Sequence, residues 1–170
     1  MFLYKVETRD SEIAGRGVYA QEAIAMGAVV GLLDHHNLIM TEEEYQDAQR
    51  RGEHLIIQSA VRLVGDYFVY NASLTDEEYI NHSESPNMLY HCGKLFAKTP
   101  IAVGDELTAD YKYFLATDDV HGFDDRDTGS QVTGLNAKEA LLQSCREVIE
   151  LFSRADFQPP RYSDYSATKA

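Results

Sequence analysis

Short apolar runs separated by turn residues fill most of the chain. Such runs predict β-strands when they alternate apolar with polar positions or form a short continuous apolar stretch. The runs are FLYKV at 2–6, AVVGLL at 28–33, HLIIQSAVRLVGDYFVYN at 54–71, MLYHCGKLFAKT at 88–99 and AVGDELTADY at 102–111. The predicted turns between strands lie at Gly65-Asp66, Cys92-Gly93 and Gly104-Asp105. The pattern therefore predicts a mainly β fold with several short strands.

Two segments carry helical signals instead. In TEEEYQDAQRRG, at 41–52, Thr41 and Glu44 form a capping box at the start of a helix. A C-terminal helix is predicted over 136–153, with Asn136 as its cap and an apolar stripe that must pack on the rest of the protein. The stripe consists of Leu141, Cys145, Val148 and Phe152.

Polar composition marks off the remaining segments. The stretch 118–135 is polar and acidic, which predicts a loop, and 154–170 is expected to be a loose tail. A chain of 170 residues with 44% hydrophobic content is long enough for one sizeable core and hardly for two. We therefore expect one domain over 1–117, followed by the acidic loop and a C-terminal helix that packs on the domain.

The net charge of −13 at pH 7 bears on possible partners. It repels a nucleic-acid backbone over most of the surface and attracts a basic protein, although an acidic surface also simply favours solubility. No apolar run approaches the length of a membrane span and no signal peptide is apparent, so we expect an intracellular protein, cytoplasmic or, in a eukaryotic host, nuclear. The two cysteines, Cys92 and Cys145, are too few for a disulfide framework or a cysteine-based zinc site.

Three motifs occur in a fixed order along the chain. They are AGRGVYA at 14–20, YINHSESPN at 79–87 and IAVGDELTADYKY at 101–113. Each motif alone is weak, but the ordered series over residues 1–115 resembles the SET-domain protein-lysine methyltransferases, most of all their short bacterial and viral members without zinc modules. The resemblance implies a SET-type, β-clip-like fold with a knot-like C-terminal motif, S-adenosylmethionine as the cofactor and a lysine side chain as the substrate.

The sequence departs from the family pattern at two places. Glu84 stands where many members carry a zinc-binding cysteine, and no cysteine cluster follows the last motif, so we expect no metal. Residues 113–153 are then the candidates for closing the lysine channel. Ala109 stands where related enzymes often carry Phe or Tyr that limits the number of methyl groups, and its small side chain leaves space.

Methyl transfer to an amine is a direct displacement that depends on alignment in a narrow, dry channel and on a neutral amine. It requires few reactive groups of the protein. By resemblance, Tyr111 is the catalytic residue, because its hydroxyl can position the amine and its ring can pack on the lysine stem. Ala109, Tyr113 and Phe114 are expected in the channel wall, and for the last two a core role fits equally well. We assign no acid-base role to Glu106 or Asp110.

The resemblance also implies a set of cofactor-binding residues. They are Gly15, Arg16, Gly17, Tyr79, Asn81 and His82. The two glycines would let the backbone approach the amino-acid end of the cofactor, the amide of Asn81 would bind that end, and backbone atoms at His82 would contact the adenine. Alternatives stay open, because the glycines also fit a tight turn, Asn81 an Asx-turn and His82 a satisfied core histidine.

The expected partner is a basic protein or peptide, histone-like or ribosomal, and a homodimer is possible. Five aspartates in 118–127 follow the catalytic motif, where they would either attract a cationic substrate to the channel mouth or form a solvated loop without contacts. We therefore predict methylation of a lysine in a basic substrate. The alternative is a catalytically silent SET-fold module that binds a cofactor or a basic peptide without turnover.

Overall fold

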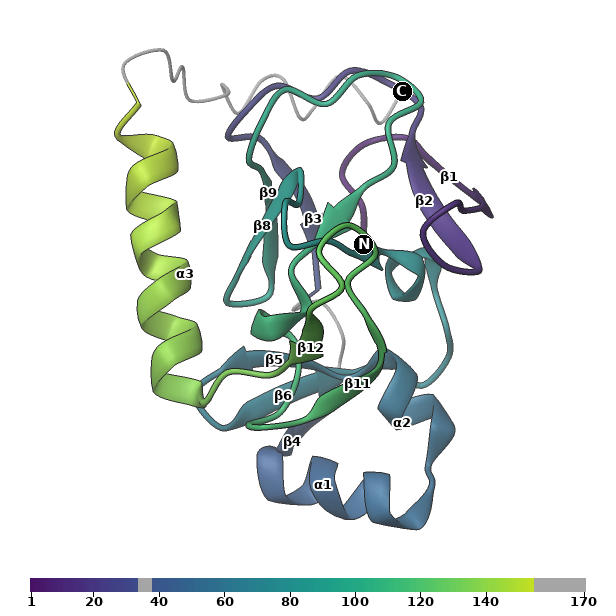
Figure 1. The fold of residues 1–170 in the computed structure, drawn as a ribbon, viewed down its shortest axis with the longest axis vertical. Helices are drawn as coiled ribbons and strands as arrows, with labels where there is room; N and C mark the ends of the chain where they lie inside the picture. The colour runs from purple at the N-terminus through teal and green to yellow at the C-terminus, as the bar shows by residue number, and fades with distance from the viewer. Residues whose placement is uncertain (34–37, 155–170) are drawn as a thin grey trace.

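The computed structural model describes residues 1–33 and 38–154, so that the predicted tail lies almost entirely outside the described residues. The described strands pair in small sheets (Figure 1). These are β1 (Val6–Asp10) with β2 (Arg16–Ala20); β3 (Val29–Leu32), β9 (Lys94–Ala97) and β8 (Met88–His91); β4 (Leu38–Thr41), β6 (Tyr67–Tyr70) and β5 (Val61–Val64); β7 (Asn81–His82) with β10 (Thr108–Ala109); and β11 (Val120–Asp124) with β12 (Gln131–Thr133). This arrangement confirms a mainly β fold of several small sheets.

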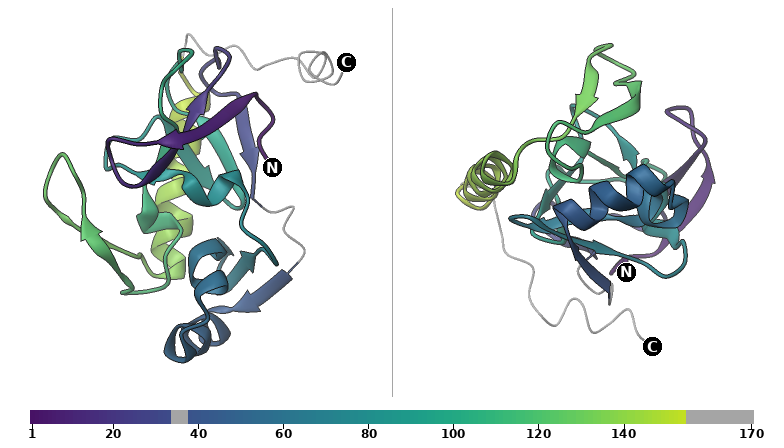
Figure 2. Two further views of the ribbon diagram at one scale, coloured as in Figure 1. Left: turned by 90° about the vertical axis from the view of Figure 1, so that its right-hand side faces the viewer. Right: turned by 90° about the horizontal axis from the view of Figure 1, so that it is seen from below.

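Helices occupy the outside of this arrangement. They are α1 (Glu42–Arg51), α2 (His54–Ser59) and α3 (Ala137–Phe152), with single 3-10 turns η1 (Asp76–Tyr79) and η2 (Tyr111–Tyr113). The predicted capping box of α1 is present, because the Thr41 hydroxyl accepts from the Glu44 N–H at 3.2 Å and the Glu44 carboxylate accepts from the Thr41 N–H at 2.7 Å. α3 lies alongside β8, on the opposite side of the molecule from the β1–β2 hairpin (Figures 1 and 2).

The structure corrects four predicted elements. Residues 54–59 form α2 instead of a strand, and the predicted strand 2–6 begins only at Val6, since the chain before it makes a single bridge between Phe2 and Gly31. The last predicted strand is reduced to β10, only two residues long. The stretch 118–135 contains the β11–β12 hairpin, because N–H groups of its turn bind the Asp125 carboxylate and Val132 is buried in the core.

The buried face of α3 is displaced from the predicted stripe. Ala140, Ser144 and Leu151 are buried, whereas Leu141 and Phe152 keep 37% and 38% of their surface exposed. Small side chains at two of the buried positions allow close packing on the sheet. The Ser144 hydroxyl is satisfied there, since it donates to the Ala140 carbonyl at 2.7 Å.

The core connects the three motif segments. Fully buried side chains of Val18, Val30, Leu95 and Leu107 bring together β2, the central β3–β9–β8 sheet and the last motif. β7 pairs in parallel with β10, and the Ser83 N–H donates to the Ala109 carbonyl at 3.1 Å. The second and third motifs therefore lie directly side by side, although they are far apart in the sequence.

Candidate active site

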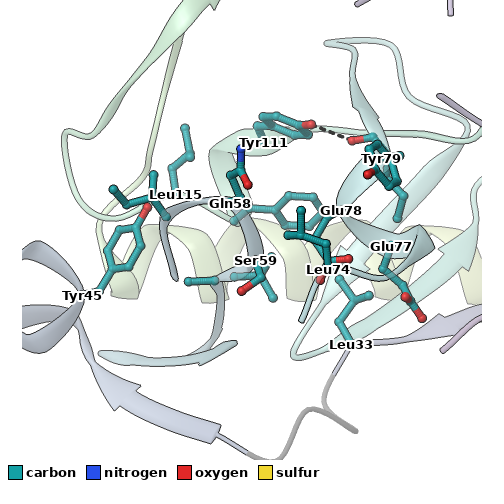
Figure 3. A pocket seen from close by; sticks show the side chains of 15 residues that line it. Leu33, Tyr45, Gln58, Ser59, Leu74, Glu77, Glu78, Tyr79, Tyr111 and Leu115 are labelled. Atoms are coloured by element: carbon teal, nitrogen blue, oxygen red, sulfur yellow. Dashed lines mark hydrogen bonds between the residues drawn. The ribbon is translucent and has the colours of Figure 1, made fainter. Parts of the chain in front are cut away.

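A cavity of about 430 Å³ lies where α1, α2, η1 and η2 meet (Figure 3). This volume is within the range of small-molecule sites. Most lining side chains are apolar, and Glu77 and Glu78 add two carboxylates. The complete lining consists of Leu33, Tyr45, Ile57, Gln58, Ser59, Ala60, Val61, Leu74, Glu77, Glu78, Tyr79, Ile80, Tyr111, Phe114 and Leu115. The cavity is therefore largely apolar, with two carboxylates on one side, of which Glu77 is paired with the N-terminal ammonium.

Tyr111 is held at this cavity from two directions. Its hydroxyl donates to the Ile80 carbonyl at 2.6 Å, the dashed line in Figure 3, and its backbone N–H donates to Nδ1 of His82 at 3.1 Å. η2 presents Tyr111 because the Asp110 carboxylate caps this turn, accepting from the Lys112 N–H at 3.1 Å. Burial raises the pKa of Tyr111, so the phenol stays protonated at neutral pH.

Asn81 binds other parts of the protein. Its side-chain NH₂ donates to the carbonyls of Ala14 and Arg16, at 3.2 and 3.0 Å, and to the Glu106 carboxylate at 2.7 Å. The amide thus fixes the glycine-containing turn of the first motif onto the second motif. A direct contact of this NH₂ with a cofactor, as the resemblance implies, would compete with these three acceptors.

The Glu106 carboxylate binds side chains from both the first and the second motif. Its carboxylate accepts from the Ser11 hydroxyl at 2.8 Å, from the Tyr19 hydroxyl at 2.9 Å and from Asn81. A Cβ at Gly17 would lie 2.1 Å from Oε1 of Glu106, so any larger residue there would force the Glu106 carboxylate to move. The resemblance implied a cofactor role for this glycine, and Glu106 was given no acid-base role, because no local signal shows which carboxylate folds back onto a distant glycine.

His82 is buried between Tyr111 and the β11–β12 hairpin. Because its Nδ1 accepts the Tyr111 N–H, the neutral ring carries its proton on Nε2, which lies 3.4 Å from Oδ2 of Asp125. Asp125 is also buried, and its Oδ2 accepts from the Glu84 N–H at 2.9 Å. Burial alone would raise the pKa of Asp125, but N–H donors from Thr128, Glu84 and Asp127 lower it, so the carboxylate stays ionised.

The other predicted site residues divide into two groups. Tyr79 and Phe114 line the cavity with Tyr111, and the Arg16 guanidinium lies 4.8 Å from the centre of the Tyr79 ring. Ala109 is fully buried, and the Tyr113 hydroxyl donates to Glu147 of α3. Among the described residues, neither of these two lines the cavity, so the alternative core role suits Tyr113.

The acidic stretch is only partly a solvated loop. Asp125 is buried against the second motif, and Asp119 accepts from the Gln49 side chain of α1 at 3.0 Å. Asp118, Asp124 and Asp127 are exposed. The five aspartates therefore do not act as one cluster, because one anchors the hairpin and another anchors α1.

Replacement of Asn81 by alanine is expected to lower the free energy of unfolding by about 1–3 kcal/mol, because buried acceptors lose their donor. Urea unfolding of parent and Asn81→Ala measures this effect. In Asn81→Asp the second carboxylate faces Glu106, and we expect a larger loss. A folded Asn81→Ala protein of unchanged stability but weakened cofactor binding would instead give Asn81 the direct cofactor role.

Stability is expected to fall in mild acid because of His82. Burial lowers its pKa below the ordinary 6.5, although Asp110, Asp125 and Glu84 oppose this shift and Lys112 adds to it. The unfolded chain then binds more protons, so this contribution is full above pH 6.5 and declines as pH falls toward the lowered pKa. Urea unfolding against pH should show a shallower acid slope in His82→Asn, whose Oδ1 can accept in place of Nδ1 without titrating; an unchanged slope contradicts the assignment.

Two features are absent from residues 1–33 and 38–154. No group of three or more His, Cys, Asp or Glu side chains in this part of the chain is placed to hold a metal ion. No helix of the same residues is both long and apolar enough to cross a membrane.

The family of the chain follows from a comparison with known domains. A search of curated proteins finds no match to this chain. The family model of the SET domain matches residues 15–112, more than half of the chain, and this span contains the glycine turn, the paired β7 and β10 strands and Tyr111. The chain therefore belongs to the SET-domain family, whose members are generally protein-lysine methyltransferases.

Proposed function

We propose that this protein transfers a methyl group from S-adenosylmethionine to a lysine side chain of a basic protein. The observation that carries the proposal is Tyr111, a protonated phenol at a largely apolar cavity, held at its backbone N–H and at its hydroxyl. Such a cavity suits the long aliphatic stem of lysine, and a fixed hydroxyl suits the alignment that methyl transfer requires.

The residues near the cavity fit S-adenosylmethionine. Arg16 would supply a guanidinium for its carboxylate, the Tyr79 ring would supply a face for its adenine, and the backbone around Gly15 and His82 would supply donors and acceptors. When bound, the cofactor supplies an electrophilic methyl group on a positively charged sulfur. Asn81 would support this surface through the turn at residues 14–17.

Residues of the chain favour the neutral form of the lysine amine and exclude water from it. Apolar walls from Ile57, Leu74 and Phe114 favour the neutral form of a lysine, whose pKa in water is about 10.4. The Tyr111 hydroxyl donates its hydrogen bond to the Ile80 carbonyl, so its oxygen can accept a hydrogen bond from the amine. No general base is required, because the amine loses its proton to solvent before attack.

A basic substrate is supported by charge. The chain carries a net charge of −13, and Glu78 lines the cavity that would receive the lysine, whereas the Glu77 carboxylate there is paired with the N-terminal ammonium. An acidic surface raises the rate at which a cationic peptide approaches. Histone-like and ribosomal proteins are therefore the first candidates, in the cytoplasm or in the nucleus of a eukaryotic host, and homodimer formation stays a prediction.

Incubation with labelled S-adenosylmethionine and a panel of basic proteins, followed by mass mapping of modified lysines, tests the proposal. We expect label on lysine of at least one basic protein and none on an acidic control protein. Titration calorimetry with S-adenosylmethionine accompanies the assay. Cofactor binding without label transfer would support the alternative of a silent SET-fold module, and absence of binding would contradict both.

A further inference from the structure

The β11–β12 hairpin contributes one buried carboxylate to the motif that holds Tyr111. The side chains of Asp125 and His82 are each only 2% exposed and lie 3.4 Å apart, between Oδ2 and Nε2. The other oxygen, Oδ1, accepts from the N–H groups of Asp127 and Thr128 at 3.0 and 2.9 Å, and from the Thr128 hydroxyl at 3.0 Å. The turn of the hairpin therefore fixes the Asp125 carboxylate independently of its contacts with the second motif.

Oδ2 of Asp125 makes two contacts with the second motif. It accepts from the Glu84 N–H at 2.9 Å and faces the Nε2 proton of His82. A carboxylate beside Nε2 favours the tautomer with its proton on that nitrogen, which leaves Nδ1 as an acceptor. Nδ1 then accepts the backbone N–H of Tyr111 at 3.1 Å.

We propose that Asp125 is a positioning residue that acts through His82 on the backbone of Tyr111, and that the β11–β12 hairpin is thereby part of the methyl-transfer site. The part of this inference that concerns activity rests on the function proposed above. The contact occurs at Glu84, where the family pattern often places a zinc-binding cysteine. Here the Asp125 carboxylate joins the C-terminal segment to the motif through one hydrogen bond from the Glu84 N–H and its approach to His82.

Asp124 provides a matched control, because it precedes Asp125 directly, carries the same charge and is exposed. In Asp125→Asn the amide must present its oxygen either to the Asp127 and Thr128 donors or to Glu84 and His82, and it cannot stabilise the ring as an anion does. We expect hydrogen exchange of the Tyr111 amide to become on the order of tenfold faster or more in Asp125→Asn. Asp124→Asn should exchange as the parent does.

Nitrogen NMR of the histidine rings tests the same chain of contacts in the parent protein, without any variant. At pH 8 we expect His82 in the neutral form with its proton on Nε2. A proton on Nδ1 would overturn the proposal, because that nitrogen could then not accept from Tyr111. Parent-like exchange of the Tyr111 amide in folded Asp125→Asn would overturn it as well.

Activity supplies an independent measurement. We expect kcat of Asp125→Asn to fall by about 10- to 100-fold, as misplacement of an aligned group does, with KM for the peptide changed much less. The acid limb of the pH profile should move to lower pH, because removal of the Asp125 charge makes His82 harder to protonate beside Asp110, Glu84 and Lys112. Parent-like kcat and an unmoved acid limb would count against the proposal.

Two further comparisons distinguish a failure of the proposed role of Asp125 from misfolding of the variant and from a failure of the proposed function. If Asp125→Asn does not fold, Thr128→Ala should show smaller changes in the same directions, because it removes the hydroxyl bond to Oδ1 and the bond that this hydroxyl accepts from the Ser130 N–H. No change there would contradict the proposal. If parent and Asp124→Asn transfer no methyl group, the proposed function fails. The Tyr111 amide exchange still decides the role of Asp125 in that case.

Discussion

Tyr111→Phe is expected to lower kcat for methyl transfer by about 10²- to 10³-fold, the usual effect of deleting one polar group aimed at the reacting atoms. The hydroxyl is the only atom removed, and the ring keeps its contacts with His82 and Phe114, whose centres lie 5.3 and 5.5 Å away. Loss of its bond to the Ile80 carbonyl should cost only about 0.5–1.5 kcal/mol of stability. The measurement is single-turnover transfer of label, compared with cofactor affinity from calorimetry.

Tyr113→Phe is the matched control for this change. It deletes the same atom two residues further on, from a hydroxyl that donates to Glu147 on α3. We expect the control to lose stability and to keep its rate within a few-fold of the parent. Equal rates for Tyr111→Phe and the parent would remove Tyr111 from the catalytic role, and equal losses in both variants would mean that the rate reports only on folding.

Local signals in the sequence predicted local features well. The capping box at Thr41, the cap at Asn136 and the turns at Gly65-Asp66 and Cys92-Gly93 depend on neighbouring residues, and the structure has all of them. The SET fold followed from the order of three motifs. The prediction of strands throughout 54–71 is wrong at 54–59, because the apolar residues there suit a short helix equally well and only tertiary packing distinguishes the two.

The candidate site could be predicted only as far as its parts lie within motifs. Tyr111 and Phe114, which were predicted at the channel, line the cavity, and so does Tyr79, which was predicted to bind the cofactor. The partners of Asn81 come from residues 14, 16 and 106. The sequence also treats Asp124 and Asp125 alike, because both are acidic residues in a polar stretch. Burial separates them, and burial depends on where the hairpin meets the second motif.

A second large effect is expected from Glu42→Gln, at the ion pair behind the cavity wall. The Arg62 guanidinium is buried and donates to both oxygens of Glu42, at 2.9 and 3.1 Å. It also donates to the carbonyl of Leu115, a cavity residue, at 3.2 Å. The amide leaves Arg62 without an anionic partner in the described part of the chain, and breaking one side of a buried pair costs about 3–5 kcal/mol.

Such a loss is a large part of the total stability of about 5–15 kcal/mol of a typical domain. Burial alone would raise the pKa of Glu42, but hydrogen bonds from Arg62 and the Thr117 N–H lower it below the ordinary 4.5. Since the folded carboxyl then releases its proton more readily than the unfolded one, the stabilisation is full above pH 4.5 and is lost as pH falls through the lowered pKa. The stability difference between parent and Glu42→Gln should therefore shrink in acid.

Glu43→Gln controls for the charge change, because Glu43 is the next residue in the first turn of α1 and is exposed. Both variants lose one negative charge near the start of the same helix, an interaction worth about 0.3–1 kcal/mol at an exposed site. Urea unfolding at pH 7 and in acid should show a large, pH-dependent loss for Glu42→Gln and a small loss for Glu43→Gln. Equal losses in the two variants would mean that the helix dipole, and not the pair with Arg62, accounts for the contribution of Glu42, and Arg62 would then hold the cavity wall through its carbonyl bonds alone.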